Sequence, residues 1–112
     1  MDSSLPRVDY NYKTFLSNFK NIVHDEKLVV IFMSSIENGR YWCPDCESAK
    51  YNINNVILPD CAKKGIQTIF VDVGSFKEWK DSKHPLRNYS KFQINGVPTL
   101  ALFENVTRLT YL

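Results

Sequence analysis

The sequence predicts an α/β domain in which helices cover both faces of a central mixed sheet. Strand and helix patterns alternate along the chain in the order β-α-β-α-β-α-β-β, which is typical of a sheet packed between two helical layers. Residues 28–33 (LVVIFM) form an unbroken apolar run, as expected for a strand buried on both faces. Two strand patterns, at 99–103 and 108–112, flank a turn at Asn105, so the last hairpin is expected to supply an antiparallel edge.

The amino-terminal part predicts a short strand followed by an amphipathic helix. The strand is expected over residues 5–8. Apolar residues at helical spacing predict the helix over residues 10–24, with Asp9 or Asn11 as its N-terminal cap. The buried strand at 28–33 then follows the helix directly.

The central part predicts a loop and a second helix. Residues 34–41 are polar and contain the turn signal Asn38-Gly39, so they are expected to form a loop. A helix is expected from Pro44 to about residue 58, where Pro59 ends it.

The following segment predicts one more strand and a mixed region. Residues 66–73 (IQTIFVDV) are rich in branched and aromatic residues and predict a strand. Residues 76–89 are expected to be partly helical and partly irregular, because His84-Pro85 interrupts them.

Composition limits the class of protein. The 112 residues are expected to form one domain, 1–112, because an apolar content of 44% at this length is enough for one core. The net charge of +2 is small and dispersed, which argues against nucleic-acid binding. The amino terminus has no apolar targeting segment and the longest apolar run is too short to cross a bilayer, so we expect a cytoplasmic protein that binds no membrane.

The motif Trp42-Cys43-Pro44-Asp45-Cys46 carries the chemistry. Pro44 has no backbone N–H, so it suits the first position of a helix, which makes Cys43 the N-cap. A thiolate is favoured there by the positive end of the helix dipole. Three cysteines cannot all pair in a disulfide framework, and a close pair in the cytosol is more often catalytic or metal-binding. The motif therefore predicts dithiol chemistry.

Together with residues 96–99 (GVPT) before the penultimate strand, this motif resembles the thioredoxin superfamily. The residues 79–81 (WKD) and the long loop before the motif resemble the small cytosolic subfamily of thioredoxin domain-containing protein 17. The resemblance covers nearly the whole chain. It implies a thioredoxin-like three-layer fold with a central mixed sheet and helices on both faces.

The resemblance also implies roles for individual residues. Cys43 matches the exposed nucleophile, Cys46 the resolving thiol, and Pro98 a proline that is cis in the family. This proline would place the backbone of Val97 beside Cys43, where an extended substrate segment can pair with it. The substrate-binding residues so implied are Trp42, Pro44, Asp45, Val97 and Pro98.

The chain departs from the thioredoxin pattern in two places. Thioredoxins carry a buried aspartate in the strand before the motif, whereas the run at 28–33 has no acid. Asp45, the carboxylate next to the thiols, is expected to point to solvent. The final helix of the family is also missing from this sequence. We therefore expect an uncovered sheet face, at which a partner docks or the chain forms a dimer, made of Leu100, Leu102, Leu109 and Tyr111.

The function implied is reduction of disulfides in proteins or small molecules. The chain would bind no cofactor and would draw reducing equivalents from NADPH through thioredoxin reductase. Glutaredoxin-like chemistry with glutathione is one alternative, although Trp42 favours the thioredoxin type. A redox-sensing adapter without turnover is another.

A zinc site is the third interpretation of the cysteine pair. Structural zinc needs four ligands, and the remaining Cys61, His24 and His84 do not have the spacing of a second half-site, so we expect no metal. Cys61 is expected to be a buried or half-buried spectator thiol. His24 is placed at a helix end and His84 in a polar loop, and neither is expected to be catalytic.

Overall fold

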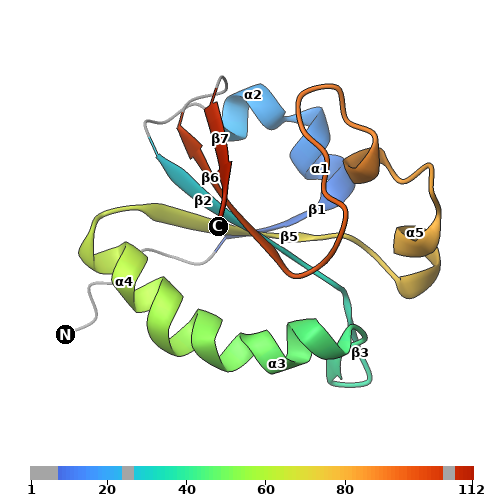
Figure 1. Cartoon of the computed structure of the whole chain (residues 1–112), viewed down its shortest axis with the longest axis horizontal. Coiled ribbons are helices and arrows are strands. Elements are labelled where there is room, and N and C mark those ends of the chain that lie inside the picture. Colours follow the sequence, from blue (N-terminus) through green and yellow to red (C-terminus); the bar gives the residue numbers. More distant parts are fainter. Residues whose placement is uncertain (1–7, 24–26, 105–107) are drawn as a thin grey trace.

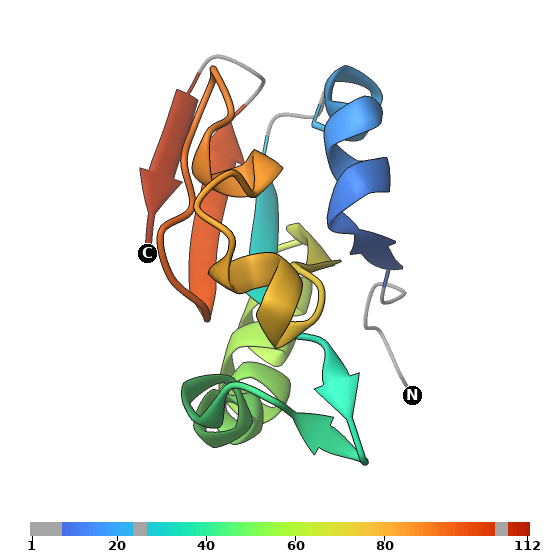
Figure 2. The same cartoon turned by 90° about the vertical axis from the view of Figure 1, so that its right-hand side faces the viewer.

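In the computed structural model, which describes residues 8–23, 27–104 and 108–112, the chain folds around a five-stranded mixed sheet. Helices lie on both faces of the sheet (Figures 1 and 2), so the predicted three-layer α/β architecture is confirmed. The spatial order of the strands is β1 (Val8–Asn11), β5 (Gln67–Asp72), β2 (Leu28–Met33), β6 (Thr99–Glu104) and β7 (Arg108–Tyr111).

Strand direction divides the sheet into two parts. Strands β1, β5 and β2 are parallel to one another, and β6 runs antiparallel to β2. Strand β7 pairs antiparallel with β6, which confirms that the last hairpin supplies an antiparallel edge.

One face of the sheet carries the short helices α1 (Tyr12–Ser17), α2 (Phe19–Ile22) and α5 (Phe76–Lys80). A single long helical path covers the other face, made of α3 (Pro44–Asn52), the π-helical segment η1 (Ile53–Ile57) and α4 (Leu58–Lys63). A short 3-10 turn, η2 (Pro85–Arg87), precedes the segment that leads into β6.

Each face of the sheet packs its own hydrophobic core, and β2 contributes to both. Side chains alternate along a strand, so Val30 and Phe32 enter the core under α1 and α2, while Val29 and Ile31 enter the core under α3 and α4. All six residues of β2 are buried. This explains why the sequence of that strand is apolar without alternation.

The helix after the cysteine motif continues past Pro59, so the prediction that Pro59 ends it was wrong. In the π-helical segment the N–H of Leu58 donates to the carbonyl of Ile53, five residues back. This wider turn moves the hydrogen-bond register by one residue, and Pro59 then falls in the first turn of α4, where a missing N–H is tolerated.

The predicted helix at 10–24 is shorter and broken. Strand β1 includes residues 10 and 11, so the predicted strand at 5–8 overlaps it only at Val8, and residues 5–7 and 24 lie outside the described residues. Asn11 is confirmed as the cap, because its side chain accepts a hydrogen bond from the N–H of Lys13 at 2.8 Å. Asn18 separates α1 from α2.

The predicted loop at 34–41 is a small ribbon, formed by β3 (Ile36–Glu37) and β4 (Arg40–Tyr41). Asn38 and Gly39 have φ values of 55° and 82°, as a two-residue type I′ hairpin turn requires. The turn signal was therefore right, although the flanking residues pair.

Of the four apolar residues predicted to form one uncovered face, Leu100 and Leu102 do not share a face with Tyr111, and the side chain of Leu109 lies outside what the structure describes. In the register of β6 and β7, Tyr111 stands opposite Ala101, whereas Leu100 and Leu102 alternate to the other side. Leu100 and Leu102 pack against the core under α3 and α4, whereas Tyr111 is 52% exposed, and the predicted dimer or partner contact stays a prediction. Among the described residues, no helix is both long and apolar enough to cross a membrane.

Candidate active site

The cysteine motif lies where the β3–β4 ribbon leads into α3. Cys43 has extended backbone angles, with φ −85° and ψ 119°, and is the N-cap of α3. Pro44 is the first helical residue, so both placements predicted from the sequence are confirmed. Cys46 follows within the first turn, and all three cysteines are free thiols.

The two thiols of the motif have different environments. Cys43 is half-buried, whereas Cys46 has an exposed fraction of 0%. Burial raises the pKa of Cys46 to about 11, and the neighbouring Cys43 contributes to the rise. Cys46 is therefore protonated at neutral pH and lies behind the more accessible sulfur.

Ser34, directly after β2, contacts both cysteines. Its hydroxyl accepts a hydrogen bond from the N–H of Cys43 at 3.2 Å, and its own N–H donates to the sulfur of Cys46 at 3.4 Å. Both groups of Ser34 lower the pKa of Cys46, against the larger effect of burial. Sequence reasoning missed Ser34, although a polar residue that ends an all-apolar buried strand was a usable signal.

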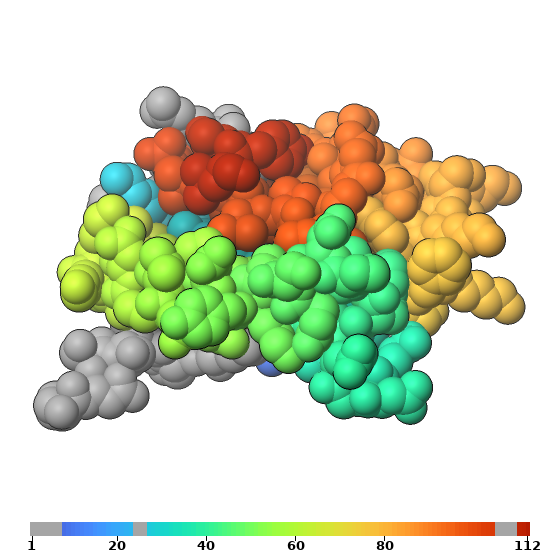
Figure 3. All heavy atoms as spheres, turned by 60° about the horizontal axis from the view of Figure 1, so that its bottom comes forward, coloured from blue at the N-terminus to red at the C-terminus, as the bar shows by residue number. Residues whose placement is uncertain are grey.

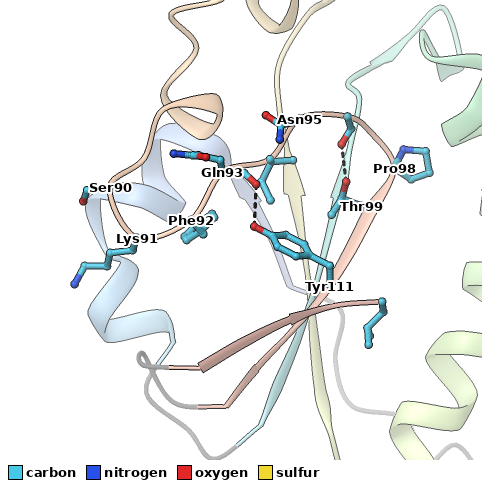
Figure 4. Close-up of a pocket in the computed structure, with 11 residues that line it drawn as sticks. Ser90, Lys91, Phe92, Gln93, Asn95, Pro98, Thr99 and Tyr111 are labelled. Atoms are coloured by element: carbon cyan, nitrogen blue, oxygen red, sulfur yellow. Dashed lines mark hydrogen bonds between the residues drawn. The ribbon is translucent and has the colours of Figure 1, made fainter.

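The Val97-Pro98 peptide bond is cis, as the resemblance implied. The thiol of Cys43 donates to the carbonyl of Val97 at 3.5 Å, so these residues, 54 positions apart, lie together. Thr99 donates its hydroxyl to the carbonyl of Gly96 at 2.6 Å and closes this turn (Figure 4). Pro98 borders a surface hollow of about 650 Å³, which Tyr111 and Leu112 also line.

Trp42 is attached to the segment that follows β5. Its indole N–H donates to the carbonyl of Gly74 at 2.9 Å, and its ring meets that of Phe76 edge to face, with centroids 5.4 Å apart. Asp72 holds the same segment, because one of its oxygens accepts from the N–H of Gly74 at 2.7 Å and from the hydroxyl of Ser35 at 2.6 Å. The sequence did not identify Gly74, Phe76 or Asp72 as neighbours of the motif.

The two exposed positions of the motif are Pro44 and Asp45, as expected for residues on the solvent side of the first turn. The carboxylate fixed in this turn is that of Glu47, which accepts from the N–H of Tyr41 at 3.0 Å and pairs with Lys50. The hydrogen bonds from Lys50 and Tyr41 hold the pKa of Glu47 below its usual range. Glu47 thereby ties the ribbon to α3.

The sequence of residues 9–111 matches the family model of thioredoxin domain-containing protein 17-like proteins, thioredoxin domain. The chain belongs to this family. Thioredoxin-like protein Clot of Arabidopsis thaliana is 28% identical over 108 residues, which cover 90% of this chain and 79% of that protein. Thioredoxin domain-containing protein 17 of Mus musculus is 30% identical over 91 residues, or 77% of this chain and 68% of that protein.

Thioredoxin-like protein Clot of Oryza sativa subsp. japonica is 37% identical over 72 residues, which cover 61% of this chain and 50% of that protein. The chain therefore spans about half the length of the rice relative. Membership of a thioredoxin-like family supports a redox function in general terms, and the dithiol of this thioredoxin domain is where that function would reside.

The other titratable residues singled out in the sequence lie away from the thiols of this thioredoxin domain or outside the described residues. Cys61 is buried in the core under α4, as predicted. His24 is not among the described residues. Within the described ranges, no group of three or more His, Cys, Asp or Glu side chains is arranged to hold a metal ion.

His84 lies in a loop whose preceding residues 81–83 are exposed, as predicted, but its own side chain is only 3% exposed. One ring nitrogen accepts from the N–H of Leu86 at 3.0 Å, so the other carries the proton and donates to the carbonyl of Val73 at 2.8 Å. The ring lies between Tyr12 and Trp79. Burial lowers the pKa of His84, and the imidazole is a neutral structural group that holds the residue before Gly74.

Proposed function

We propose that this chain reduces disulfides by dithiol exchange at Cys43 and Cys46. The observation that carries the proposal is the pair of unlike thiols: Cys43 is half-buried at the N-terminus of α3, and Cys46 is fully buried one turn further along. A helix N-terminus favours the thiolate form of a cysteine at its cap. Both cysteines contact Ser34, whose hydroxyl accepts from the N–H of Cys43 and whose N–H donates to the sulfur of Cys46, so they lie on the same side of the first turn of α3 as that residue.

In the first step, the thiolate of Cys43 attacks one sulfur of the substrate disulfide. A Cys43–substrate disulfide forms, the substrate S–S bond breaks, and the leaving thiolate takes a proton from water. In the second step, Cys46 loses its proton and attacks the sulfur of Cys43. The Cys43–Cys46 disulfide forms, the Cys43–substrate disulfide breaks, and the second substrate sulfur leaves as a thiolate that takes up a proton. The two electrons gained by the substrate are supplied by the thiols of Cys43 and Cys46, which are oxidised to the disulfide.

Recognition of the substrate would use the residues around Cys43. The carbonyl of Val97 already accepts from the Cys43 thiol, and cis-Pro98 follows it, so an extended substrate segment could lie along this backbone. Trp42, Pro44 and Asp45 border the same thiol. We assign these residues to substrate binding.

The oxidised pair must be reduced again by an external donor. We propose thioredoxin reductase, supplied with NADPH, as that donor, and disulfide-bearing proteins or small disulfides such as cystine as substrates. The reaction belongs in a reducing compartment such as the cytosol, where protein thiols are kept free. No cofactor bound to the chain is needed for either step.

Reductase assays with different donors test the proposal. NADPH oxidation is followed at 340 nm with thioredoxin reductase, a test disulfide and the wild-type chain, and separately with glutathione and its reductase as donor. Activity with thioredoxin reductase, lost in Cys43→Ser and kept in the control Cys61→Ser, supports the proposal. Turnover with glutathione alone favours the glutaredoxin type. Binding of partners that depends on oxidation state, without turnover from either donor, favours the adapter.

A further inference from the structure

Phe76 is an exposed aromatic residue beside the dithiol. Its side chain is 55% exposed although it is large and apolar. Its ring packs edge to face on Trp42, with an angle of 80° between the rings, and Trp42 immediately precedes Cys43. The two rings form a corner beside the accessible thiol, which we call the aromatic shelf.

The aromatic shelf is held in place from several sides. Ser75 caps α5 reciprocally with Glu78: its hydroxyl accepts from the N–H of Glu78 at 3.1 Å, and its N–H donates to the Glu78 carboxylate at 2.8 Å. The same carboxylate accepts from the hydroxyl of Tyr12 at 2.9 Å. Together with the bond from the Trp42 indole to Gly74, these contacts fix Phe76 while leaving about half of it open to solvent.

The shelf and the Val97 segment both adjoin Cys43. The thiol donates to the carbonyl of Val97, and its neighbour Trp42 contacts Phe76. Figure 3 shows the surfaces of these three parts of the chain, around the start of α3, the start of α5 and the segment before β6, meeting on one face. A segment that pairs with Val97 at its attacked cysteine therefore has a neighbouring residue beside the shelf.

The charged side chains of α5 indicate which type of substrate residue would follow the one beside the aromatic shelf. Glu78 is engaged by Ser75 and Tyr12, so the helix presents the cations Lys77 and Lys80 to solvent. The ammonium group of Lys80 lies 5.6 Å from the centre of the Phe76 ring. A carboxylate just beyond an apolar side chain would complement this arrangement.

We propose that Trp42 and Phe76 select disulfide-bearing polypeptides in which a large apolar side chain adjoins the attacked cysteine and an acidic residue follows it. The inference rests on the proposed reductase function and adds to it a class of substrate. The apolar side chain covers the open half of Phe76, and the acidic residue lies near Lys80. Aromatic anchors at a small contact of this kind dominate its affinity.

Oxidised peptides of equal length test the selection. One peptide carries Leu-Asp after the target cysteine, and the other carries Gly-Ser. For the wild-type chain we expect kcat/KM to be about fivefold to tenfold higher for the Leu-Asp peptide, as for the loss of one aromatic contact. Phe76→Ala removes most of this ratio, mainly through KM, and Phe76→Leu restores part of it.

Tyr51→Ala is the matched control, because Tyr51 is 70% exposed in α3 and stands about 12 Å along the helix from Cys43. It should leave the peptide ratio unchanged. Equal kcat/KM for the two peptides in the wild-type chain, or an unchanged ratio in Phe76→Ala, overturns the inference.

Binding without chemistry separates this inference from the reductase proposal. The same peptides are titrated calorimetrically into Cys43→Ser and into Cys43→Ser with Phe76→Ala. Preference for the Leu-Asp peptide that depends on Phe76 supports the shelf even if no disulfide is turned over, in which case only the reductase proposal fails. Turnover without any dependence on Phe76 rejects the shelf and leaves the reductase proposal standing.

Discussion

Replacing Ser34 by alanine should slow the second half of the reaction. The substitution deletes a hydroxyl that accepts from the N–H of Cys43 and that helps to lower the pKa of Cys46. The backbone N–H of Ser34 still donates to the sulfur of Cys46, so only one of the two stabilising groups is lost. The pKa of Cys46, already raised to about 11 by burial, should therefore rise further.

The magnitude follows from the value of one hydrogen bond. A net contribution of about 1 kcal/mol raises the pKa by about 0.7. At neutral pH the thiolate fraction of Cys46 then falls about fivefold, because the pH lies far below the pKa. A more basic thiolate attacks faster, by about twofold at a Brønsted coefficient of ~0.45, so the resolving step should slow by about twofold to threefold.

Single-turnover experiments measure this step directly. The mixed disulfide of Cys43 with a test substrate is formed, samples are quenched in acid and alkylated, and the loss of the mixed disulfide is followed by mass spectrometry. Between pH 7 and 9.5 the resolving rate should rise about tenfold per pH unit in both proteins, with Ser34→Ala always slower. The control is Ser35→Ala, whose hydroxyl bonds to Asp72. A Ser34→Ala protein that resolves at the wild-type rate or faster refutes this assignment of Ser34.

Three other predictions concern stability in urea or heat. Because burial lowers the pKa of His84, the unfolded chain binds its proton first, so the free energy of unfolding should fall as pH drops below about 6.5, and His84→Gln should lose less between pH 7 and 5. Burial raises the pKa of Cys46, so stability should fall as pH rises from about 9 towards 11, and Cys46→Ala should show a smaller alkaline loss; equal losses would contradict the burial argument. Gly74→Ala should destabilise the chain by about 1–3 kcal/mol, because Gly74 has φ 96° and an added Cβ would lie 2.6 Å from the Glu78 carboxylate. Gly65→Ala is the control, because Gly65 has φ 69° with open space around it and shares only the backbone strain. A loss of stability in Gly74→Ala no larger than in Gly65→Ala would count against the contact with Glu78.

Features that depend on neighbouring residues in the sequence were predictable. The run at 28–33 predicted that both faces of β2 are covered, because every residue in it is apolar. The motif placed Cys43 at the N-cap because Pro44 fits only the first turn of a helix. Asn38-Gly39 marked its turn through the positive φ that both residues adopt.

Features that depend on tertiary contact were not predictable in the same way. A proline such as Pro59 usually ends a helix. Here the helix continues, because it goes on packing against the sheet and because the π-helical turn before Pro59 accommodates the missing N–H. His84 was assigned to a polar loop because its sequence neighbours are polar, whereas its burial comes from Tyr12 and Trp79. The roles of Ser34 and Phe76 depend on residues that only the fold brings near them.

The sheet topology explains why these distant residues meet at one place. Strands β1, β5 and β2 are parallel, so the residues that follow them, Tyr12, Gly74 and Ser34, lie together at the end of the sheet where these three strands finish. Strand β6 runs in the opposite direction, and its first residue, Thr99, pairs with Phe32 near the end of β2.

The segment that leads into β6, with Val97, therefore lies at the same end of the sheet. The N-terminus of α3 is therefore contacted by the segment before the antiparallel strand β6 and by the segments that follow the parallel strands. If β6 were parallel to β2, Val97 would lie at the opposite end of the strands, away from Cys43. The mixed character of the sheet is thus a condition for the site, because a fully parallel sheet of the same strands would leave the accessible thiol without the backbone that a substrate segment would use.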